Sequence, residues 1–132
     1  MATVAKSGTP SLSSVQPPQT CVIGSGLKAG AAIAAGDLVY IAAAGTVLPS
    51  NGTSANAAAK VDGIAVRAAA SGEAVDVYRY VEVRYGSGMT PGTRLYAQTT
   101  AGLISDAATT GGTAPIGFVV DATRIFIHGS HY

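Results

Sequence analysis

Short apolar, β-branched runs separated by glycine-containing turns recur along most of the chain. From residue 21 onward such a run appears about every ten residues, the spacing typical of a β-sandwich or a β-barrel. The best helix candidates, AGAAIAAG (29–36) and ANAAAKV (55–61), are too short to be stable alone and are flanked by glycine or asparagine. The pattern therefore predicts an all-β domain.

The order of these runs repeats once along the chain. AAGDLVYIAAAGTVLPS (34–50) aligns with TPGTRLYAQTTAGLISD (90–106), and GIAV (63–66) aligns with GFVV (117–120). A closing strand follows each copy, AVDVY in the first and RIFI in the second. The separation between copies varies from 54 to 57 residues, and such small insertions are tolerated in loops.

The repeat predicts two similar halves, at about residues 27–85 and 86–128, within a single β-domain that spans residues 21–132. Residues 1–20 are rich in Ser, Thr, Pro and Gln, so they are expected to form a flexible or extended N-terminal arm. Three apolar residues of this arm are candidates for contacts with a groove or an exposed sheet edge, namely Val4, Leu12 and Val15.

The Gly36-Asp37 pair stands just before an apolar run, where a catalytic or ligand-binding carboxylate could lie. Its counterpart Gly92 follows a proline, and a Pro-Gly pair signals a turn, so Gly36 is predicted to be a turn glycine with positive φ. Asp37 is matched by Thr93 rather than by an acid. A carboxylate used in one copy alone stays possible, but a turn aspartate before a strand is the favoured interpretation.

Other candidate chemistry is weak. CVIGSGLKAG (21–30) has the spacing G-x-G-x-x-x-G, one residue longer than the dinucleotide-binding fingerprint, and no βαβ unit follows. His128 and His131 end a strand without a nearby carboxylate or cysteine, and Cys21 has no evident base. We therefore expect no catalytic, cofactor or metal site, and no enzyme.

Composition points to a protein that packs against others. Charged residues make up 11% of the chain, against about 25% in average soluble domains, so Ala, Gly, Ser and Thr must cover much of the surface. The net charge is +1 and no Lys/Arg run exists, which argues against nucleic acid. The N-terminus lacks a secretory signal, the longest apolar stretch is too broken to span a membrane, and a single cysteine suits a reducing cytoplasm. We expect a soluble protein without a membrane partner.

The stretch VDVYRYVEVRYGSG (75–88) alternates in apolar and polar residues. One face would carry Val75, Val77, Val81, Val83 and Tyr85, and the other Asp76, Tyr78, Tyr80, Glu82 and Arg84. Arg79 interrupts the apolar register, which predicts a bulge or bend where the strand changes sheet or partner. Interleaved Tyr and Arg could bind nucleic acid or sugar, but protein interfaces favour them too. We predict a capsid or subunit interface that includes Tyr78, Arg79, Tyr80 and Arg84.

The succession AGDLVYI, TVLPS, VDGIAV, SGEAVDVY and VEV resembles the small capsid decoration (cement) proteins of tailed bacteriophages. The resemblance covers about residues 27–127 and departs in the second copy, where TPGTRLY lacks the acidic residue and DATRIFI lacks the "aGE" turn. It implies a small barrel or a β-clip/β-tulip-like domain. It also implies a homotrimer that binds the major capsid protein on the outer surface of the virion and stabilises the capsid, after synthesis in the host cytoplasm.

Two other classes stay open. A carbohydrate-binding or receptor-binding β-module on a virion surface could use the tyrosines. An enzyme or carrier domain ranks third, because a lipoyl-type hairpin needs a lysine at a tight turn and Lys60 lies in an Ala-rich loop.

Overall fold

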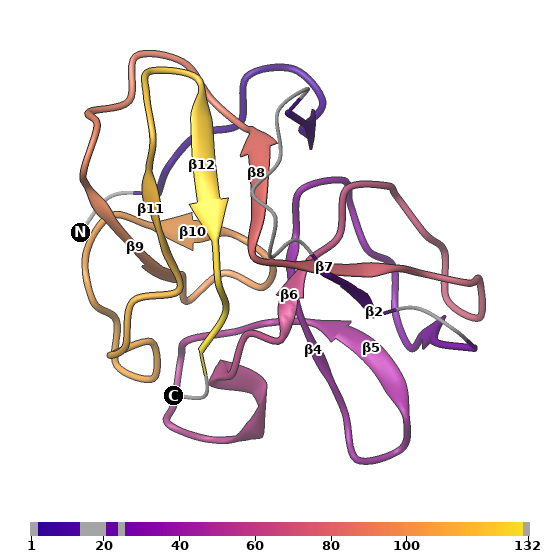
Figure 1. The fold of residues 1–132 in the computed structure, drawn as a ribbon. Helices are drawn as coiled ribbons and strands as arrows, with labels where there is room; N and C mark the ends of the chain where they lie inside the picture. Colours follow the sequence, from indigo (N-terminus) through magenta and orange to yellow (C-terminus); the bar gives the residue numbers. More distant parts are fainter. Residues whose placement is uncertain (1–2, 14–20, 24–25, 131–132) are drawn as a thin grey trace.

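The computed structural model describes residues 3–13, 21–23 and 26–130, and within these the chain forms two six-stranded sheets (Figure 1). The first sheet has the order β2 (Cys21–Ile23), β7 (Val77–Arg79), β6 (Gly63–Ile64), β4 (Leu38–Ile41), β5 (Thr46–Pro49) and β3 (Lys28–Ala29). The second has the order β1 (Ser11–Leu12), β8 (Val81–Arg84), β12 (Arg124–Ile127), β11 (Gly117–Val119), β9 (Arg94–Ala97) and β10 (Ile104–Ser105). One sheet curls into a half-barrel, and the helix of the described residues is a single 3-10 turn, η1 (Ala57–Ala59). The all-β prediction is confirmed.

The predicted repeat is confirmed by the strand pairing. β4, β5, β6 and β7 correspond to β9, β10, β11 and β12, and the orders β7-β6-β4-β5 and β12-β11-β9-β10 are the same. The register agrees as well, since Leu38 pairs with Ile64 where Arg94 pairs with Phe118. The match therefore extends to which side chains stand opposite one another.

Turn glycines begin the two copies in the same way. Gly36 and Gly92 have φ values of 84° and 85°, a conformation that only glycine adopts freely. Their N–H groups donate to equivalent carbonyls, Ala65 at 2.6 Å and Val119 at 2.8 Å. The predicted turn role of Gly36 is confirmed.

The chain passes from one sheet to the other at Tyr80. This residue has φ 52°, a left-handed conformation that is uncommon outside glycine, and it separates β7 in the first sheet from β8 in the second. The predicted bend near Arg79 is confirmed (Figure 1). Strand β8 lies in the second sheet, although the expected first half extended to residue 85.

Two apolar clusters form the core. The larger lies between the sheets, where Leu38 and Ile64 of the first sheet pack against Leu95, Ile125 and other inward-facing side chains of the second. The smaller covers the opposite face of the first sheet and contains Ala29, Ile33, Val39, Val47, Ala65, Ala69, Val75 and Val77. The first sheet is therefore buried on both faces.

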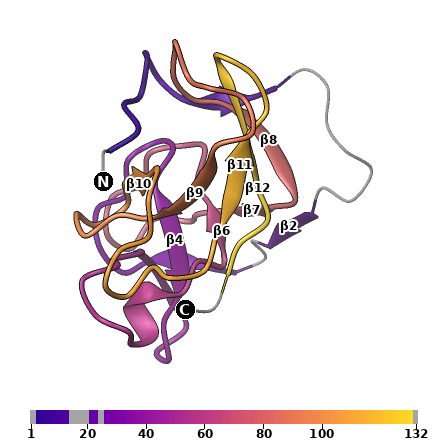
Figure 2. The same ribbon diagram turned by 90° about the vertical axis from the view of Figure 1, so that its left-hand side faces the viewer.

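Residues 3–13 run extended along the second sheet, from the β10 side to the β8 side (Figure 2). Thr3 bridges to Ser105, and Ser11 and Leu12 pair with β8 as strand β1. Between these contacts the Ser7 N–H donates to the Tyr85 carbonyl at 2.9 Å. The N-terminal arm was expected to be either flexible or extended, and residues 3–13 are extended. Residues 14–20 lie outside the described part.

Candidate interaction surface

Most of the predicted interface residues gather along one strand and its neighbour. β7 and β8 follow one another through the bend at Tyr80, and on the same side β2 pairs with β7 and β1 pairs with β8, both antiparallel. We call this border of the two sheets the β1–β2 edge, made of β1, β2 and the bend at Tyr80. Three of the exposed large apolar side chains lie on it: Leu12, Val22 and Tyr80, with exposed fractions of 40%, 54% and 41%.

The other predicted residues differ in their surroundings. Tyr78 is half-buried against the core between the sheets, and Arg84 is exposed opposite Ser11. Val4 packs against the same core, and its N–H donates to the Ile104 carbonyl at 2.8 Å, so it lies away from the β1–β2 edge. Val15 falls outside the described residues.

Arg79 supports the bend. Its Nε donates to the His128 carbonyl at 3.0 Å, and its guanidinium carbon lies 5.6 Å from the centre of the Tyr80 ring. These contacts hold the residue that follows β12, His128, against the bend at Tyr80 that joins the two sheets. Arg79 therefore positions Tyr80, which is the more exposed of the two.

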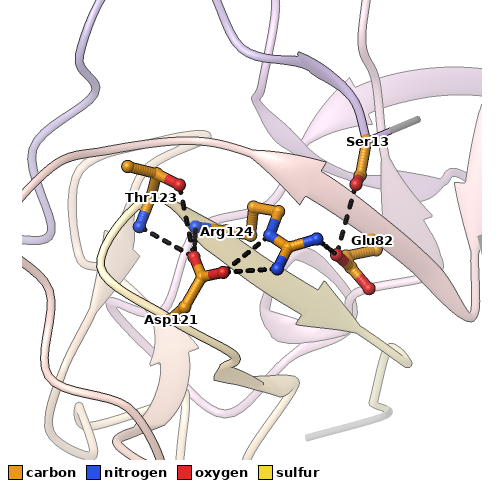
Figure 3. Close-up of polar contacts among 5 residues, drawn as sticks. All are labelled: Ser13, Glu82, Asp121, Thr123 and Arg124. Atoms are coloured by element: carbon orange, nitrogen blue, oxygen red, sulfur yellow. Dashed lines mark hydrogen bonds and ion pairs between the residues drawn. The ribbon is translucent and has the colours of Figure 1, made fainter. Parts of the chain in front are cut away.

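A chain of polar contacts joins the β1–β2 edge to the β11–β12 turn (Figure 3). Asp121 accepts the Thr123 and Arg124 backbone N–H groups at 3.0 and 2.9 Å, and its other oxygen accepts Nε of Arg124 at 2.7 Å. Arg124 then reaches the Glu82 carboxylate at 2.8 Å, which also accepts the Ser13 hydroxyl at 3.2 Å. The network fixes where the end of β1 lies on β8.

The same network shifts the protonation equilibria of its members. The hydrogen bond from the Arg124 side chain, followed by the Thr123 N–H, holds the pKa of Asp121 far below its usual range. That bond also raises the pKa of Arg124. Sequence reasoning missed this network, although an aspartate two residues before a threonine is a known turn-capping signal.

A second surface was also missed. Cross-strand pairing aligns Glu82, Phe126, Phe118 and Arg94 in one row across the outward side of the second sheet. The Phe118 and Phe126 rings stack with centroids 5.3 Å apart, and Phe118 is 43% exposed. We call Arg94, Phe118 and Phe126 the outer aromatic face. The sequence feature that could have indicated this face is Phe118 in GFVV, at the position where the first copy has Ile64.

Asp37 is a structural carboxylate. It accepts the Ala34 N–H at 2.9 Å and pairs with the Lys6 ammonium at 3.1 Å. Gly102 packs so closely that a Cβ there would lie 2.6 Å from the Asp37 carboxyl carbon. The bond from Ala34 fits the favoured interpretation of a turn aspartate. The contacts with Lys6 and Gly102, which join the N-terminal segment to turns of both halves, were not predicted.

Tyr85 lies beside this group. It is 1% exposed, and its hydroxyl has no hydrogen-bond partner among the described residues. Burial, and then the negative charge of Asp37, raise the pKa of this hydroxyl well above its ordinary value. A phenol held neutral in this way is an apolar packing group with one unsatisfied polar atom.

Metal-binding groups do not cluster: over residues 3–13, 21–23 and 26–130, no three His, Cys, Asp or Glu side chains come together in a way that could hold an ion. Nδ1 of His128 lies 2.8 Å from the Gly129 carbonyl, and His131 is outside the described residues. In the described part of the chain, no helix has the length and hydrophobicity needed to cross a membrane.

Comparison of the chain with protein-family models, curated proteins and solved structures gives no match. The fold, the β1–β2 edge and the outer aromatic face are therefore the features that bear on function.

Proposed function

We propose that this protein is a structural virion protein that binds the outer surface of a phage capsid and stabilises it, acting as a homotrimer that bridges subunits of the major capsid protein. The observation that carries the proposal is the β1–β2 edge. Exposed sheet edges are usually protected by charges, prolines or covering segments. Here Leu12 and Val22 present apolar side chains on the edge strands of the two sheets instead.

An open edge with apolar side chains suits a protein partner. A strand of another chain can add to it through main-chain hydrogen bonds, while Leu12, Val22 and Tyr80 contact its side chains. The low charge content favours the same kind of partner, because burying few charges costs little desolvation. The resemblance to decoration proteins supplies the capsid as that partner.

Carbohydrate binding is the second candidate, and the aromatic contacts favour it less. A sugar platform needs exposed rings with free faces. Tyr78 is half-buried, and Arg79 lies over the Tyr80 ring. The two phenylalanines stack on one another, so each has one face occupied.

The test measures binding to capsids assembled from the major capsid protein encoded in the same genome. Co-sedimentation should show saturable binding by the native protein, and Leu12→Asp and Val22→Asp should each weaken it roughly tenfold or more, about 1.4 kcal/mol. Ala44→Asp, in an exposed loop of the first half, is the control and should bind like the native protein. Binding to a glycan array without capsid binding, or full binding by both edge variants, would contradict the proposal.

A further inference from the structure

The two halves differ in what covers one equivalent face. By register, Arg94, Phe118 and Phe126 of the second sheet correspond to Leu38, Ile64 and Tyr78 of the first. Leu38 and Ile64 are fully buried, because the second half packs on them. Phe118 is exposed in the position of Ile64. The second half thus exposes aromatic side chains on the face whose equivalent in the first half is buried against the second half.

The way the first half is covered indicates the kind of partner. Its face packs against the inward side of the other half, so the contact joins two different surfaces of one repeated unit. A contact between different surfaces, repeated between copies of a chain, is heterologous and closes into a ring when the rotation permits. The partner expected on the outer aromatic face is accordingly a second copy of this chain, in a contact like the one between the two halves.

A groove at the margin of the first half is suited to receive this face. It has a volume of about 170 Å³ and is lined by Val66, Ala69, Ala74, Val75 and Tyr78, together with the charged side chains of Arg67 and Asp76. For comparison, an apolar cavity of about 150 Å³ is large enough for benzene. The groove therefore has room for one phenylalanine ring.

The outer aromatic face and the groove carry one pair of opposite charges, Arg94 and Asp76, although Arg67 also lines the groove. Arg94 stands next to Phe118 in the row of the outer aromatic face, and it is exposed. Asp76 lines the groove and is exposed. Neither makes an ion pair within the part of the chain that the structure describes. Docking of the face on the groove would bring these opposite charges to the same border, where charge pairing fixes orientation.

We propose that the outer aromatic face of one copy binds the Val66–Asp76 groove of a second copy, with Phe118 in the groove and Arg94 paired with Asp76. Repeated head to tail, this contact would join the three chains of the proposed trimer into a ring. The inference deepens the proposed function, on whose trimer it rests, because it assigns the surfaces that hold the trimer together.

Sedimentation equilibrium of the full chain without capsids tests this assignment. The native protein should form a trimer. Phe118→Ser, Arg94→Glu and Asp76→Lys should each weaken self-association at least tenfold, and the double variant R94E/D76K should recover it, because the reversed pair keeps opposite charges together. Leu12→Asp, on the β1–β2 edge, is the matched control and should remain trimeric. Far-ultraviolet circular dichroism of each variant checks folding, and Asp76→Lys, an exposed substitution, keeps the test valid if Phe118→Ser fails to fold.

Three results would overturn the inference: a monomeric native protein, a native dimer, which would indicate a two-fold contact, or a trimer unaffected by Phe118→Ser and Asp76→Lys. Capsid co-sedimentation separates this failure from that of the proposed function. A protein that binds capsids without these contacts rejects only the assigned surfaces, and a trimer of the expected kind that ignores capsids rejects only the capsid role.

Discussion

The two halves share a backbone plan but differ in environment. β7-β6-β4-β5 and β12-β11-β9-β10 have the same order, the same register and the same turn glycines. In both, one glycine leaves no room for a Cβ, since Gly63 and Gly117 pack against the carbonyl oxygens of Tyr78 and Phe126. The faces, by contrast, are free to differ: Leu38 and Ile64 are buried where Arg94 and Phe118 meet solvent.

This difference shows which constraints belong to the repeated unit and which belong to its surroundings. Turn geometry and strand spacing are constraints within each half, so equivalent positions in the two copies satisfy them with the same residue type. Burial depends on what packs on the unit from outside. Equivalent positions should therefore respond alike to backbone changes and differently to side-chain truncation.

The largest effect is expected from truncating the equivalent residues Ile64 and Phe118. Ile64→Ala should lower the free energy of unfolding by about 3 kcal/mol, because it leaves a cavity between the sheets. Phe118→Ala should lower it by less, about 1 kcal/mol, since Phe118 is already 43% exposed and leaves no closed cavity between the sheets. Urea titration at concentrations that keep the protein monomeric measures both values. Equal losses would refute the asymmetry of the two faces.

A smaller difference is expected at the turn position that Asp37 and Thr93 share. Asp37→Ala removes the pairing with Lys6 and the bond from the Ala34 N–H, and should cost about 2 kcal/mol. Thr93→Ala removes one exposed hydrogen bond to the Thr90 carbonyl and should cost about 0.5 kcal/mol. Thermal unfolding followed by circular dichroism compares them. Similar losses would mean that the N-terminal segment contributes nothing through Asp37.

The smallest effect has the opposite sign. Tyr85→Phe should stabilise the protein by about 1 kcal/mol, because it removes a buried hydroxyl that has no described partner. In the native protein, the folded pKa of Tyr85 lies above the unfolded value of 10.0, so its contribution is complete below that pH and is lost as the pH rises further.

Urea titrations across the alkaline range measure how steeply the unfolding free energy falls as the pH rises. The unfolding free energy of Tyr85→Phe should fall less steeply above about pH 10 than that of the native protein. Thr93→Ala, which changes no ionisable side chain, is the control and should keep the native slope. Identical slopes for Tyr85→Phe and the native protein would contradict the prediction.

Local patterns sufficed for the strands, the repeat and the bend. Alternation placed Val77, Val81 and Val83 on one buried side, and the interruption at Arg79 located the change of sheet. These features depend on neighbours in sequence, which is why they could be predicted. The β1–β2 edge was anticipated in part, since Leu12 and Tyr80 were both named.

Contacts between distant segments could not be predicted in this way. Nothing near Lys6 indicates that Asp37 is its partner, and nothing near Ser11 indicates that β8 has a vacant side. Residues 3–13 therefore looked like an arm, although they pair with their own domain. The exposure of Phe118 was missed for a related reason, because alternation gives the side of a strand but not whether another element covers it.

The pairing of β1 with β8 also has a consequence for biosynthesis. Ser13 lies 69 residues before Glu82, so the segment is translated well before the strand that receives it. At about 5–20 residues per second, that delay is on the order of 3–14 s, far longer than a loop or hairpin takes to close. During this interval β1, with the apolar side chain of Leu12, has no strand to pair with. β12, which pairs with the other side of β8, is synthesised after both, so the second sheet is completed late in synthesis.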